Sequence, residues 1–266
     1  MLPSWLWILW ALLLLPKSLP LTETSSPCED ILPQLWKDHI LRNSSLLSTI
    51  LSEFQGNKCS LDAVNLDGDS ALILTVTRGY FDSFKLLLEA GAATNVANGL
   101  GFTALHVACA RNRTEFALAL LPSSVVSLRA ANGMTAFLYA CRLGNVHLLR
   151  EFLRMGVRRE VKDAEGNSCL HLAVLSGKES AVTLLLHSGF DVNAVDNRHR
   201  RTALMLAAGL GNEDVLRGML DSAPDLALRD VGGRTALDHA LSTRNHRIVD
   251  ELRRALVQRA KRPSEL

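Results

Sequence analysis

Two short stretches of the sequence place a histidine close to a cysteine: His106 with Cys109, and Cys169 with His171. Imidazole and thiolate groups are common zinc ligands, and a thiolate beside an imidazole is also the arrangement of a cysteine nucleophile. A zinc site needs three or four converging ligands, and a nucleophile needs an exposed thiolate with a helper group. Neither pair has further metal ligands or a helper group beside it. We therefore expect no metal site, no cofactor and no enzymatic activity.

Two further cysteines, Cys28 and Cys59, bracket the N-terminal part of the chain. If the chain is secreted, we expect them to form a disulfide, because disulfides persist in oxidising compartments. Two unpaired thiols are the alternative. The chain has only five cysteines, an odd number, so disulfides are not expected to be its main source of stability.

Two Asn-X-Ser/Thr triplets, at Asn43 and Asn112, match the acceptor pattern for N-glycosylation. Such triplets also arise by chance. Asn43 falls in an expected turn between two helices and is the better acceptor, whereas Asn112 falls in a tight slot between helices. A glycan on either residue would place the chain in the secretory lumen.

The run "RHRR" at residues 198–201 places four basic residues together. Guanidinium groups bind carboxylates and phosphates, so the run is a candidate anion site. The whole chain has 29 basic and 27 acidic residues, and this net charge of +2 is too small for a general polyanion binder. We therefore expect an acidic stretch of a protein partner at this run. Phosphorylated protein, nucleic acid or anionic lipid is the alternative, of which nucleic acid is the least expected.

Residues 1–24 contain an unbroken apolar run of eleven residues, "WLWILWALLLL". A bilayer requires a helix of about 20 residues, so the run is too short for an ordinary membrane span and fits the apolar core of a secretory signal peptide. This predicts a chain in the secretory pathway or secreted. An uncleaved membrane anchor, or a soluble apolar segment on a cytoplasmic protein, is the alternative.

One phrase recurs six times along the chain. Its copies read "SALILTVTRG", "TALHVACARN", "TAFLYACRLG", "SCLHLAVLSG", "TALMLAAGLG" and "TALDHALSTR". They begin 33, 32, 33, 34 and 33 residues apart, at Ser70, Thr103, Thr135, Ser168, Thr202 and Thr235. This period predicts one supersecondary unit used six times, because a short helix pair cannot bury its apolar face alone but can bury it against copies of itself.

Each unit has the pattern of a short helix pair. The leading Ser or Thr can cap the free N–H groups at the start of a first helix, which we call the inner helix. Small residues in its middle let neighbouring inner helices approach closely, and leucine or phenylalanine at the third position fills the core between them. Glycine ends most inner helices, and a second, outer helix with paired leucines follows.

These residues resemble the ankyrin repeat, whose inner helix opens with T-P-L-H-x-A. The T-A-L-H phrase and the endings "ATNVAN" and "DVNAVD" carry the resemblance over residues 65–258. Alanine or cysteine replaces the proline of the family, and alanine forms helix well. The resemblance implies an all-α solenoid of six stacked helix pairs with short β-hairpin-like tips. It also implies that His106 and His171 tie adjacent hairpins by hydrogen bonds.

The two ends of the chain depart from the repeat pattern, as terminal repeats do. Residues 28–64 predict a degenerate helical cap with two amphipathic helices, at about 29–41 and 45–54. At the other end, the pattern predicts a charged helix that covers the last core layer. Residues 259–266 then form a short basic tail.

In ankyrin-like stacks the hairpin tips and the ends of the inner helices line one concave surface, which implies that a protein partner binds there. Leu100, Phe102 and Met134 fall in neighbouring tips, and we expect them to be exposed apolar anchors. Folding of some of them back onto the stack is the alternative. Leu175 and Leu210 fall near the ends of inner helices, without a further assigned role.

The basic residues expected on the same surface are Arg142, Arg198, His199, Arg201 and Arg234. Arg200 stands where the other tips have glycine, and its tip lies within the interval of 34 residues, between Ser168 and Thr202. We expect this longer tip to protrude and to turn without the positive φ that glycine supplies. The sequence thus predicts a non-catalytic scaffold or adaptor that binds a protein partner with an acidic stretch, and a membrane only if the N-terminal segment is uncleaved.

Overall fold

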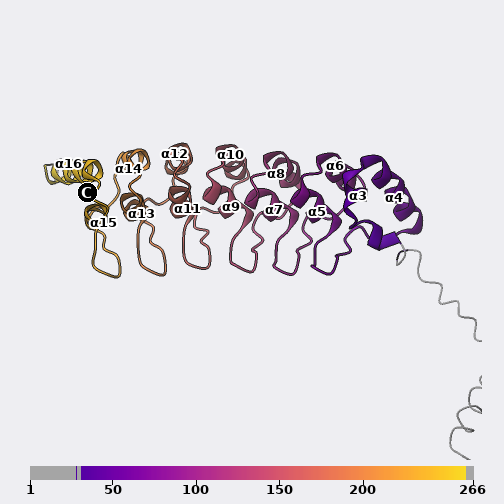
Figure 1. Ribbon diagram of the computed structural model, residues 1–266. Coiled ribbons are helices and arrows are strands. Elements are labelled where there is room, and N and C mark those ends of the chain that lie inside the picture. The colour runs from indigo at the N-terminus through magenta and orange to yellow at the C-terminus, as the bar shows by residue number, and fades with distance from the viewer. Residues whose placement is uncertain (1–27, 29–30, 262–266) are drawn as a thin grey trace, which may run out of the picture.

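The computed structural model describes residue 28 and residues 31–261, and shows a single row of stacked helix pairs (Figure 1). The expected segment at residues 1–24 and most of the basic tail lie outside these described residues. Within them there is no β-strand, only isolated β-bridges at the base of several tips. The prediction of an all-α solenoid is therefore confirmed. No helix of the described part is long and apolar enough to cross a bilayer.

Inner and outer helices alternate along the described chain, so that each repeat supplies one of each (Figure 1). The inner helices are α5 (Ala71–Arg78), α7 (Ala104–Ala110), α9 (Ala136–Leu143), α11 (Cys169–Ser176), α13 (Ala203–Leu210) and α15 (Ala236–Ser242). The outer helices are α6 (Phe81–Glu89), α8 (Thr114–Leu120), α10 (Val146–Arg154), α12 (Glu179–His187), α14 (Glu213–Leu220) and α16 (His246–Ala260), with the short 3-10 turn η2 (Leu121–Ser123) after α8.

The first residue of the recurring phrase is the N-cap of each inner helix, and in five of the six its hydroxyl accepts a hydrogen bond from a backbone N–H of the first turn. In α11 the Ser168 hydroxyl instead lies 2.7 Å from His171 Nδ1. The Ser70 hydroxyl accepts a hydrogen bond from Ile73 N at 3.3 Å, and Thr135 accepts one from Leu138 N at 3.3 Å. Such a cap stabilises a helix by about 1 kcal/mol relative to alanine. The recurrence of the phrase therefore sets the beginning of every inner helix.

Several outer helices begin at an asparagine that also joins two repeats. The Asn145 side-chain oxygen accepts a hydrogen bond from Leu148 N at 3.1 Å, while its nitrogen donates to Asn112 Oδ1 at 2.7 Å in the preceding repeat. Asn212 and Asn245 use both ends of their amides in the same way. One side chain thus caps a helix and fixes the spacing between neighbours.

The core is a continuous apolar layer between successive helix pairs. The small-residue position of every inner helix is fully buried, at Thr75, Ala108, Ala140, Ala173, Ala207 and Ala240. Larger side chains such as Leu105, Phe137 and Leu170 fill the space between neighbouring pairs. Burial of one such side chain contributes about 1.5–3 kcal/mol, so each repeat is stabilised mainly by its neighbours.

The N-terminal cap is less regular than the sequence predicted. The expected helix at 29–41 is divided into a 3-10 turn, η1 (Leu32–Gln34), and a short helix, α3 (Asp38–Arg42), because the backbone is extended at Lys37. The second helix, α4 (Ser44–Asn57), starts at an Asn43 cap and runs longer than expected. Cys28 and Cys59 are joined by a disulfide that ties the start of this cap to its end.

A second disulfide, which the sequence did not predict, joins Cys141 in α9 to Cys169 in α11. Both residues are fully buried, and their Cα atoms are 5.4 Å apart. Cys141 directly follows the small residue Ala140 and is the seventh residue of its phrase, whereas Cys169 is the second residue of the next phrase, in the proline position of the family. These two positions are distant along one helix. They become neighbours only when two successive repeats stack. Cys109 remains a free, buried thiol.

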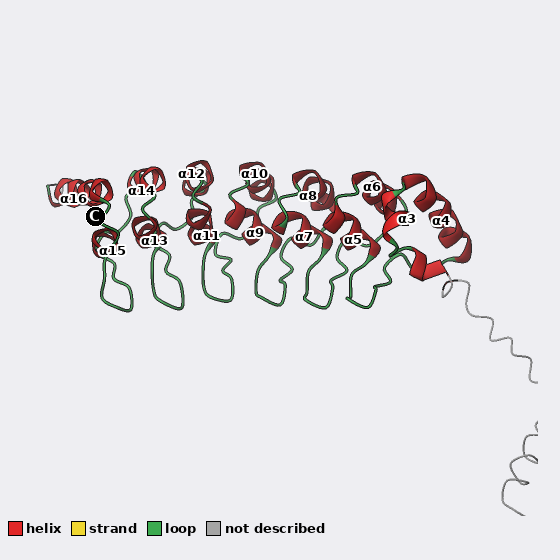
Figure 2. Ribbon diagram, viewed as in Figure 1, coloured by secondary structure: helices red, strands yellow, loops and turns green. Residues whose placement is uncertain are grey.

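The tips are tight turns that project from the inner helices on the side away from the outer helices (Figure 2). Bridges such as Arg129 to Thr135 and Lys162 to Ser168 close their bases, which gives them a hairpin-like form without a regular sheet. Glycine occupies the last turn position in most tips, with φ between +72° and +82°. The packing of neighbouring tips leaves little room for a side chain at several of these glycines.

The prediction that Arg200 would escape a positive φ is wrong. Its φ is +54°, in the left-handed region that costs a non-glycine residue about 1 kcal/mol. The turn is closed by a hydrogen bond from Asp196 N to Arg201 O at 3.0 Å, and the chain must still reverse directly before the closing residue. One additional residue lengthens the tip but does not remove this reversal.

Two glycines at the same place in different tips separate the cost of a positive φ from the cost of crowding. A Cβ on Gly166 would lie 2.5 Å from Asn197 N in the next tip, whereas a Cβ on Gly233 in the last tip meets no atom within 4 Å. We expect Gly233→Ala to lower the free energy of unfolding by about 1 kcal/mol and Gly166→Ala by roughly 2–4 kcal/mol, as measured by chemical denaturation. Equal losses would show that the tips do not pack as described.

Candidate functional site

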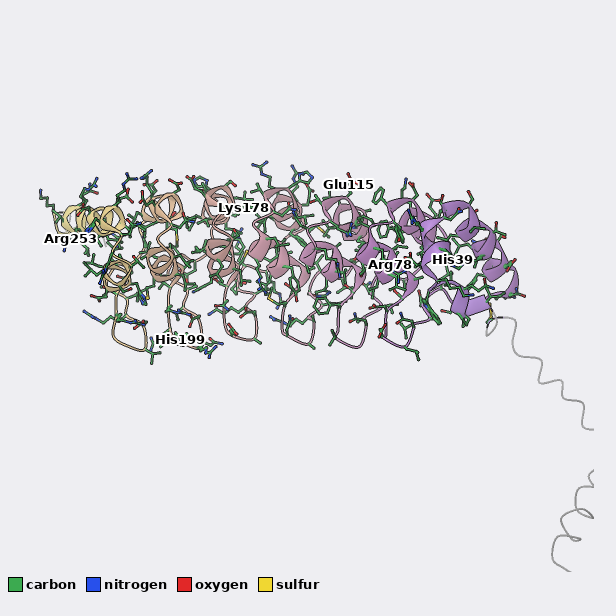
Figure 3. All side chains as sticks on the ribbon, viewed as in Figure 1. His39, Arg78, Glu115, Lys178, His199 and Arg253 are labelled. Atoms are coloured by element: carbon green, nitrogen blue, oxygen red, sulfur yellow. A yellow bond between two sulfur atoms is a disulfide. The ribbon has the colours of Figure 1, made fainter. Side chains whose placement is uncertain are left out.

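The exposed positions of the inner helices and the tips form one surface, which we call the inner surface (Figure 3). The sequence predicted its partner-binding residues on this surface. Their roles depend on three properties: whether each side chain is exposed, whether its charge is already paired, and how firmly its tip is held.

The tips are held by side-chain amides and carboxylates at their first turn position. Asn98 Oδ1 accepts hydrogen bonds from Leu100 N at 3.1 Å and Phe102 N at 2.9 Å, and Asp163 Oδ1 does the same for Glu165 N and Asn167 N. Successive tips are also joined through the backbone, for example by Ala131 N donating to Leu100 O at 2.9 Å. The tips therefore present their side chains from an ordered backbone.

The two histidines of the T-A-L-H phrase and its variant are structural. His106 Nδ1 lies 2.9 Å from Thr103 Oγ1, and His106 Nε2 donates to Leu128 O of the next repeat at 3.0 Å. His171 makes the equivalent bond to Arg201 O at 2.9 Å. Burial lowers the pKa of both imidazoles, so they stay neutral at physiological pH. These bonds tie adjacent hairpins as the resemblance implied.

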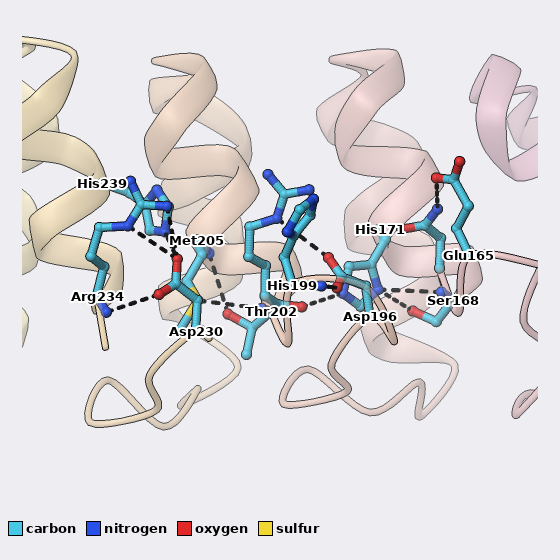
Figure 4. Close-up of polar contacts among 12 residues, drawn as sticks. Glu165, Ser168, His171, Asp196, His199, Thr202, Met205, Asp230, Arg234 and His239 are labelled. Atoms are coloured by element: carbon cyan, nitrogen blue, oxygen red, sulfur yellow. Dashed lines mark hydrogen bonds and ion pairs between the residues drawn. The ribbon is translucent and has the colours of Figure 1, made fainter. Parts of the chain in front are cut away.

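The basic run at residues 198–201 divides into free and paired cations. Arg198, His199 and Arg200 are exposed at the tip, where Figure 3 labels His199. Arg201 is half-buried and pairs with the buried carboxylate of Asp196 at 3.4 Å (Figure 4). Burial opposes ionisation of Asp196, but the hydrogen bond from His199 N and the Arg201 guanidinium outweigh it and hold its pKa below the usual value. Arg201 thus has a partner within the chain.

Arg234 has the same arrangement in the last tip. Its guanidinium lies 3.1 Å from Asp230 Oδ2, and His239 Nε2 lies 2.9 Å from the same oxygen (Figure 4). Burial opposes ionisation of Asp230, but the hydrogen bonds from Arg234 N, His239 and the Arg234 guanidinium lower its pKa to about 2. The free cations expected for an acidic partner are therefore Arg198 and Arg200, together with Arg142, which is exposed on α9.

The three predicted apolar anchors differ in how far their side chains are exposed. Leu100 is 64% exposed, Phe102 is half-buried near the Tyr139 ring, and Met134 is only 4% exposed. The expectation that Met134 is exposed is wrong. It directly precedes the Thr135 cap, and an apolar side chain at that position packs back onto the first turn of its helix. Phe102 precedes the cap of α7 in the same way.

A different set of apolar side chains is exposed on the inner surface. Three leucines lie near the ends of the adjacent inner helices α11, α13 and α15, and their exposed fractions are 51% for Leu175, 57% for Leu210 and 48% for Leu241. The sequence placed two of them at helix ends without a role and did not identify Leu241.

Leu175 and Leu210 occupy the eighth and ninth positions of the recurring phrase, which are not buried in any of the six repeats. Leu241 occupies the seventh position, which is buried in the other repeats, for example at Val174 and Ala208; it is exposed at the end of the stack because no further inner helix among the described residues packs on α15. We call Leu175 and Leu210 the leucine strip, and leucine at these two positions of adjacent units was the signal that could have found it.

The two glycosylation triplets differ in the way their side chains are used. Asn43 is exposed, and its side-chain oxygen accepts hydrogen bonds from Ser45 N and Leu46 N at the start of α4. Asn112 has a φ of +56°, and both its oxygen and the Thr114 hydroxyl accept hydrogen bonds from Asn145. In the folded chain Asn43 is therefore the less constrained acceptor.

No group of three or more His, Cys, Asp or Glu side chains among the described residues is arranged to hold a metal ion. Burial raises the pKa of the Cys109 thiol well above its usual value, so this group is not a thiolate at physiological pH. The inner surface is the feature of the described chain with the clearest capacity for binding.

Comparison with known proteins identifies relatives built from the same repeat. A family model described as ankyrin repeats (3 copies) matches residues 41–127 and 123–196. A putative ankyrin repeat-containing protein of Treponema pallidum is 33% identical over 106 residues, which are 40% of this chain and 36% of that protein. The mouse B-cell lymphoma 3 protein homolog is 29% identical over 201 residues, 76% of this chain and 39% of that protein.

Among solved structures, the ankyrin repeat domain of Bcl-3, described as a member of the IkappaB protein family, superimposes with a TM-score of 0.70 at 28% identity. The match covers 80% of this chain and 96% of the Bcl-3 domain. The two curated relatives above are much longer than the region they share with this chain, which spans less than two fifths of either. The similarity therefore concerns the repeat domain.

The different environments of Met134 and Leu100 give a direct test of the tip geometry. We expect Met134→Ala to lower the free energy of unfolding by roughly 2–5 kcal/mol, because it empties a buried position. Leu100→Ala, which removes an exposed leucine from the neighbouring tip, should change it by less than about 0.5 kcal/mol. Chemical denaturation of both variants measures the difference. A Met134→Ala protein as stable as the Leu100→Ala protein would contradict the burial described above.

Proposed function

The chain belongs to the ankyrin repeat family, and from this premise we propose that it is a non-catalytic adaptor that binds a protein partner on the inner surface of its C-terminal repeats. Ankyrin repeats are protein–protein interaction domains. What is specific to this chain is the position of the binding surface and the chemistry of the partner.

The observation that carries this proposal is the leucine strip of Leu175 and Leu210. Apolar side chains left half-exposed on two adjacent helices lose contact with water when a partner covers them, and such residues usually supply most of the energy of an interface. Each leucine of the strip lies at the end of an ordered helix, so its position on the surface is fixed. It therefore resembles the centre of an interface more than scattered surface leucines do.

The exposed cations at the edges of the inner surface indicate the charge of the partner. Arg142 lies on α9, beside the first helix of the strip, and Arg198 and Arg200 lie on the tip that precedes α13. None of the three has an ion pair within the described chain. A partner segment with apolar residues at its centre and acidic residues at its ends would complement both features.

Pairing within the tips supports a protein partner more than a polyanion at this surface. Arg201 and Arg234 are held by Asp196 and Asp230, so one arginine of the run at 198–201 and the arginine of the next tip are already neutralised. Two free arginines at one tip are few for a nucleic acid or an anionic membrane, whose binding increases with the number of charge contacts. Apolar anchoring with a few peripheral charges fits the surface better.

For the cellular location, we propose the secretory pathway or the extracellular space. The support is the pair of disulfides, Cys28–Cys59 and Cys141–Cys169, because disulfides form and persist in oxidising compartments. The exposed Asn43 acceptor is consistent with the same location. Both features are independent of the apolar N-terminal run.

The partner chemistry can be tested with a random peptide display library selected on the purified chain. We expect enriched peptides that combine leucine or a similar apolar residue with Asp or Glu. Leu210→Glu should weaken their binding at least tenfold in calorimetry, because a carboxylate would be buried under the bound peptide. Leu66→Glu, a fully exposed leucine in the first tip, is the matched control and should change affinity less than twofold. Equal losses, or selection of peptides without apolar residues, would refute the proposed surface.

The location can be tested by expression of the full chain in animal cells. We expect a glycosidase to shift its gel mobility and Asn43→Gln to reduce that shift. Mass analysis after alkylation without a reductant should find one free thiol, Cys109, in the unfolded chain. A chain without glycan and with five alkylated thiols would place the repeats in a reducing compartment and contradict the proposed location.

A further inference from the structure

A second candidate site lies in the outer layer of the solenoid, away from the tips. A surface pocket of about 670 Å³ opens between the C-terminal halves of the outer helices α10 and α12. Its walls are formed by α10, the loop at 155–160 that leads into the fourth repeat, and α12. The volume is in the range of small-ligand sites. This pocket is separate from the leucine strip and has no role in the function proposed above.

Four arginines line this pocket: Arg150, Arg154, Arg158 and Arg159. Arg150 and Arg154 are one helical turn apart on α10 and so share a face, while the other two extend from the loop. Glu160 is the only carboxylate of the lining. All four arginines are exposed, and within the described chain only Arg154 has an ion pair, with Glu151. Three guanidinium groups around one pocket are therefore free to bind an anion.

The loop at 155–160, which contains Arg158 and Arg159, carries arginines that the other junctions between repeats lack. The corresponding segments at 90–95, 121–127, 188–193 and 221–227 contain no Lys or Arg. In three of these four segments the backbone is also held differently: Ala93 N, Val125 N and Asp225 N each donate to an Asp or Asn side chain of the preceding repeat, whereas Asp191 N in the segment at 188–193 makes no such bond to a described residue. Arg158 N, at the equivalent position, makes no such bond to a described residue. Repeat architecture does not require these arginines, since four other junctions are built without them.

The shape and charge of the pocket limit the classes of ligand that can bind in it. Its floor includes Leu153, Val157 and Leu184, which are partly buried against the core, and its rim is cationic. The lining contains no aromatic side chain on which a nucleic-acid base could stack. An apolar floor below guanidinium groups suits a sugar ring, which has apolar C–H faces, bearing anionic substituents on its edge. Arginine binds such oxyanions through two parallel N–H donors.

We propose that the pocket binds a sulfated glycan, with Arg150, Arg158 and Arg159 contacting its sulfate groups. Basic clusters of this kind are typical of heparin-binding patches. The choice of sulfate over phosphate rests on the secretory location proposed above, because sulfated polysaccharides are major polyanions outside the cytosol. The site adds a glycan anchor in the outer layer to the protein-binding surface of the inner layer.

A size-defined heparin hexasaccharide is the probe for this site, with binding to the full chain measured by calorimetry at several salt concentrations. We expect Arg158→Ala/Arg159→Ala to raise Kd at least tenfold and to make the salt dependence of Kd less steep. Arg253→Ala/Arg254→Ala is the matched control, because it removes the same charge from an exposed adjacent pair on α16. The tip variant Arg198→Ala/Arg200→Ala is a second control. Both controls should change Kd less than twofold, and all variants should melt within a few degrees of the wild type.

Four results would overturn the proposal. Failure of the hexasaccharide to bind at millimolar concentration would exclude the site, and equal binding of a fully desulfated hexasaccharide would exclude recognition of sulfate. Equal losses in the control variants would show diffuse attraction rather than a site. Tighter, Arg158-dependent binding to single-stranded DNA or to vesicles with phosphoinositides would assign the pocket to another class of ligand. None of these results bears on peptide binding at the leucine strip, so the two proposals can fail independently.

Discussion

The inner helices contain only seven or eight residues each, which is too short for any of them to be stable alone in water. They persist because each repeat buries its apolar face against the repeat before it and the repeat after it. The fully buried small residues, from Thr75 to Ala240, allow this close approach, and the asparagines at the start of several outer helices set its distance. All other features of the chain, including the order of the tips and the continuity of the inner surface, depend on this stacking.

Stacking also decides which polar groups remain available for a partner. Two carboxylates, Asp196 and Asp230, are buried at the base of their tips and would be costly there without partners. These carboxylates pair with Arg201 and Arg234, so the two arginines stabilise the fold and are less available to a partner. The same reasoning applies to the buried imidazoles, which join hairpins. The polar groups that a partner can bind are those that these internal contacts leave unpaired.

The recurring phrase was sufficient to predict the all-α class, the six inner helices and most of the core, because helix caps and apolar periodicity are local signals. Errors arose where the outcome depends on contacts between repeats or on the path of the backbone. Met134 looks exposed in a tip but packs onto its own helix, and Arg200 adopts a positive φ that its residue type disfavours. Cys141 and Cys169 occupy different positions of the motif, so their pairing follows only from the stacked arrangement. The leucine strip was missed because no single leucine in it departs from the pattern of its repeat.

The Cys141–Cys169 disulfide makes the resistance of the repeat stack to extension differ along its length. A solenoid whose repeats contact only their neighbours can unravel one unit at a time from either end when it is pulled. The cysteines are 28 residues apart, and the segment between them cannot be drawn out while the covalent bond is intact. At about 3.5 Å per residue this withholds roughly 100 Å of contour length from the extended chain. The third and fourth repeats are therefore covalently locked together, while the repeats on either side of them can extend, and the arginine pocket lies at this locked junction.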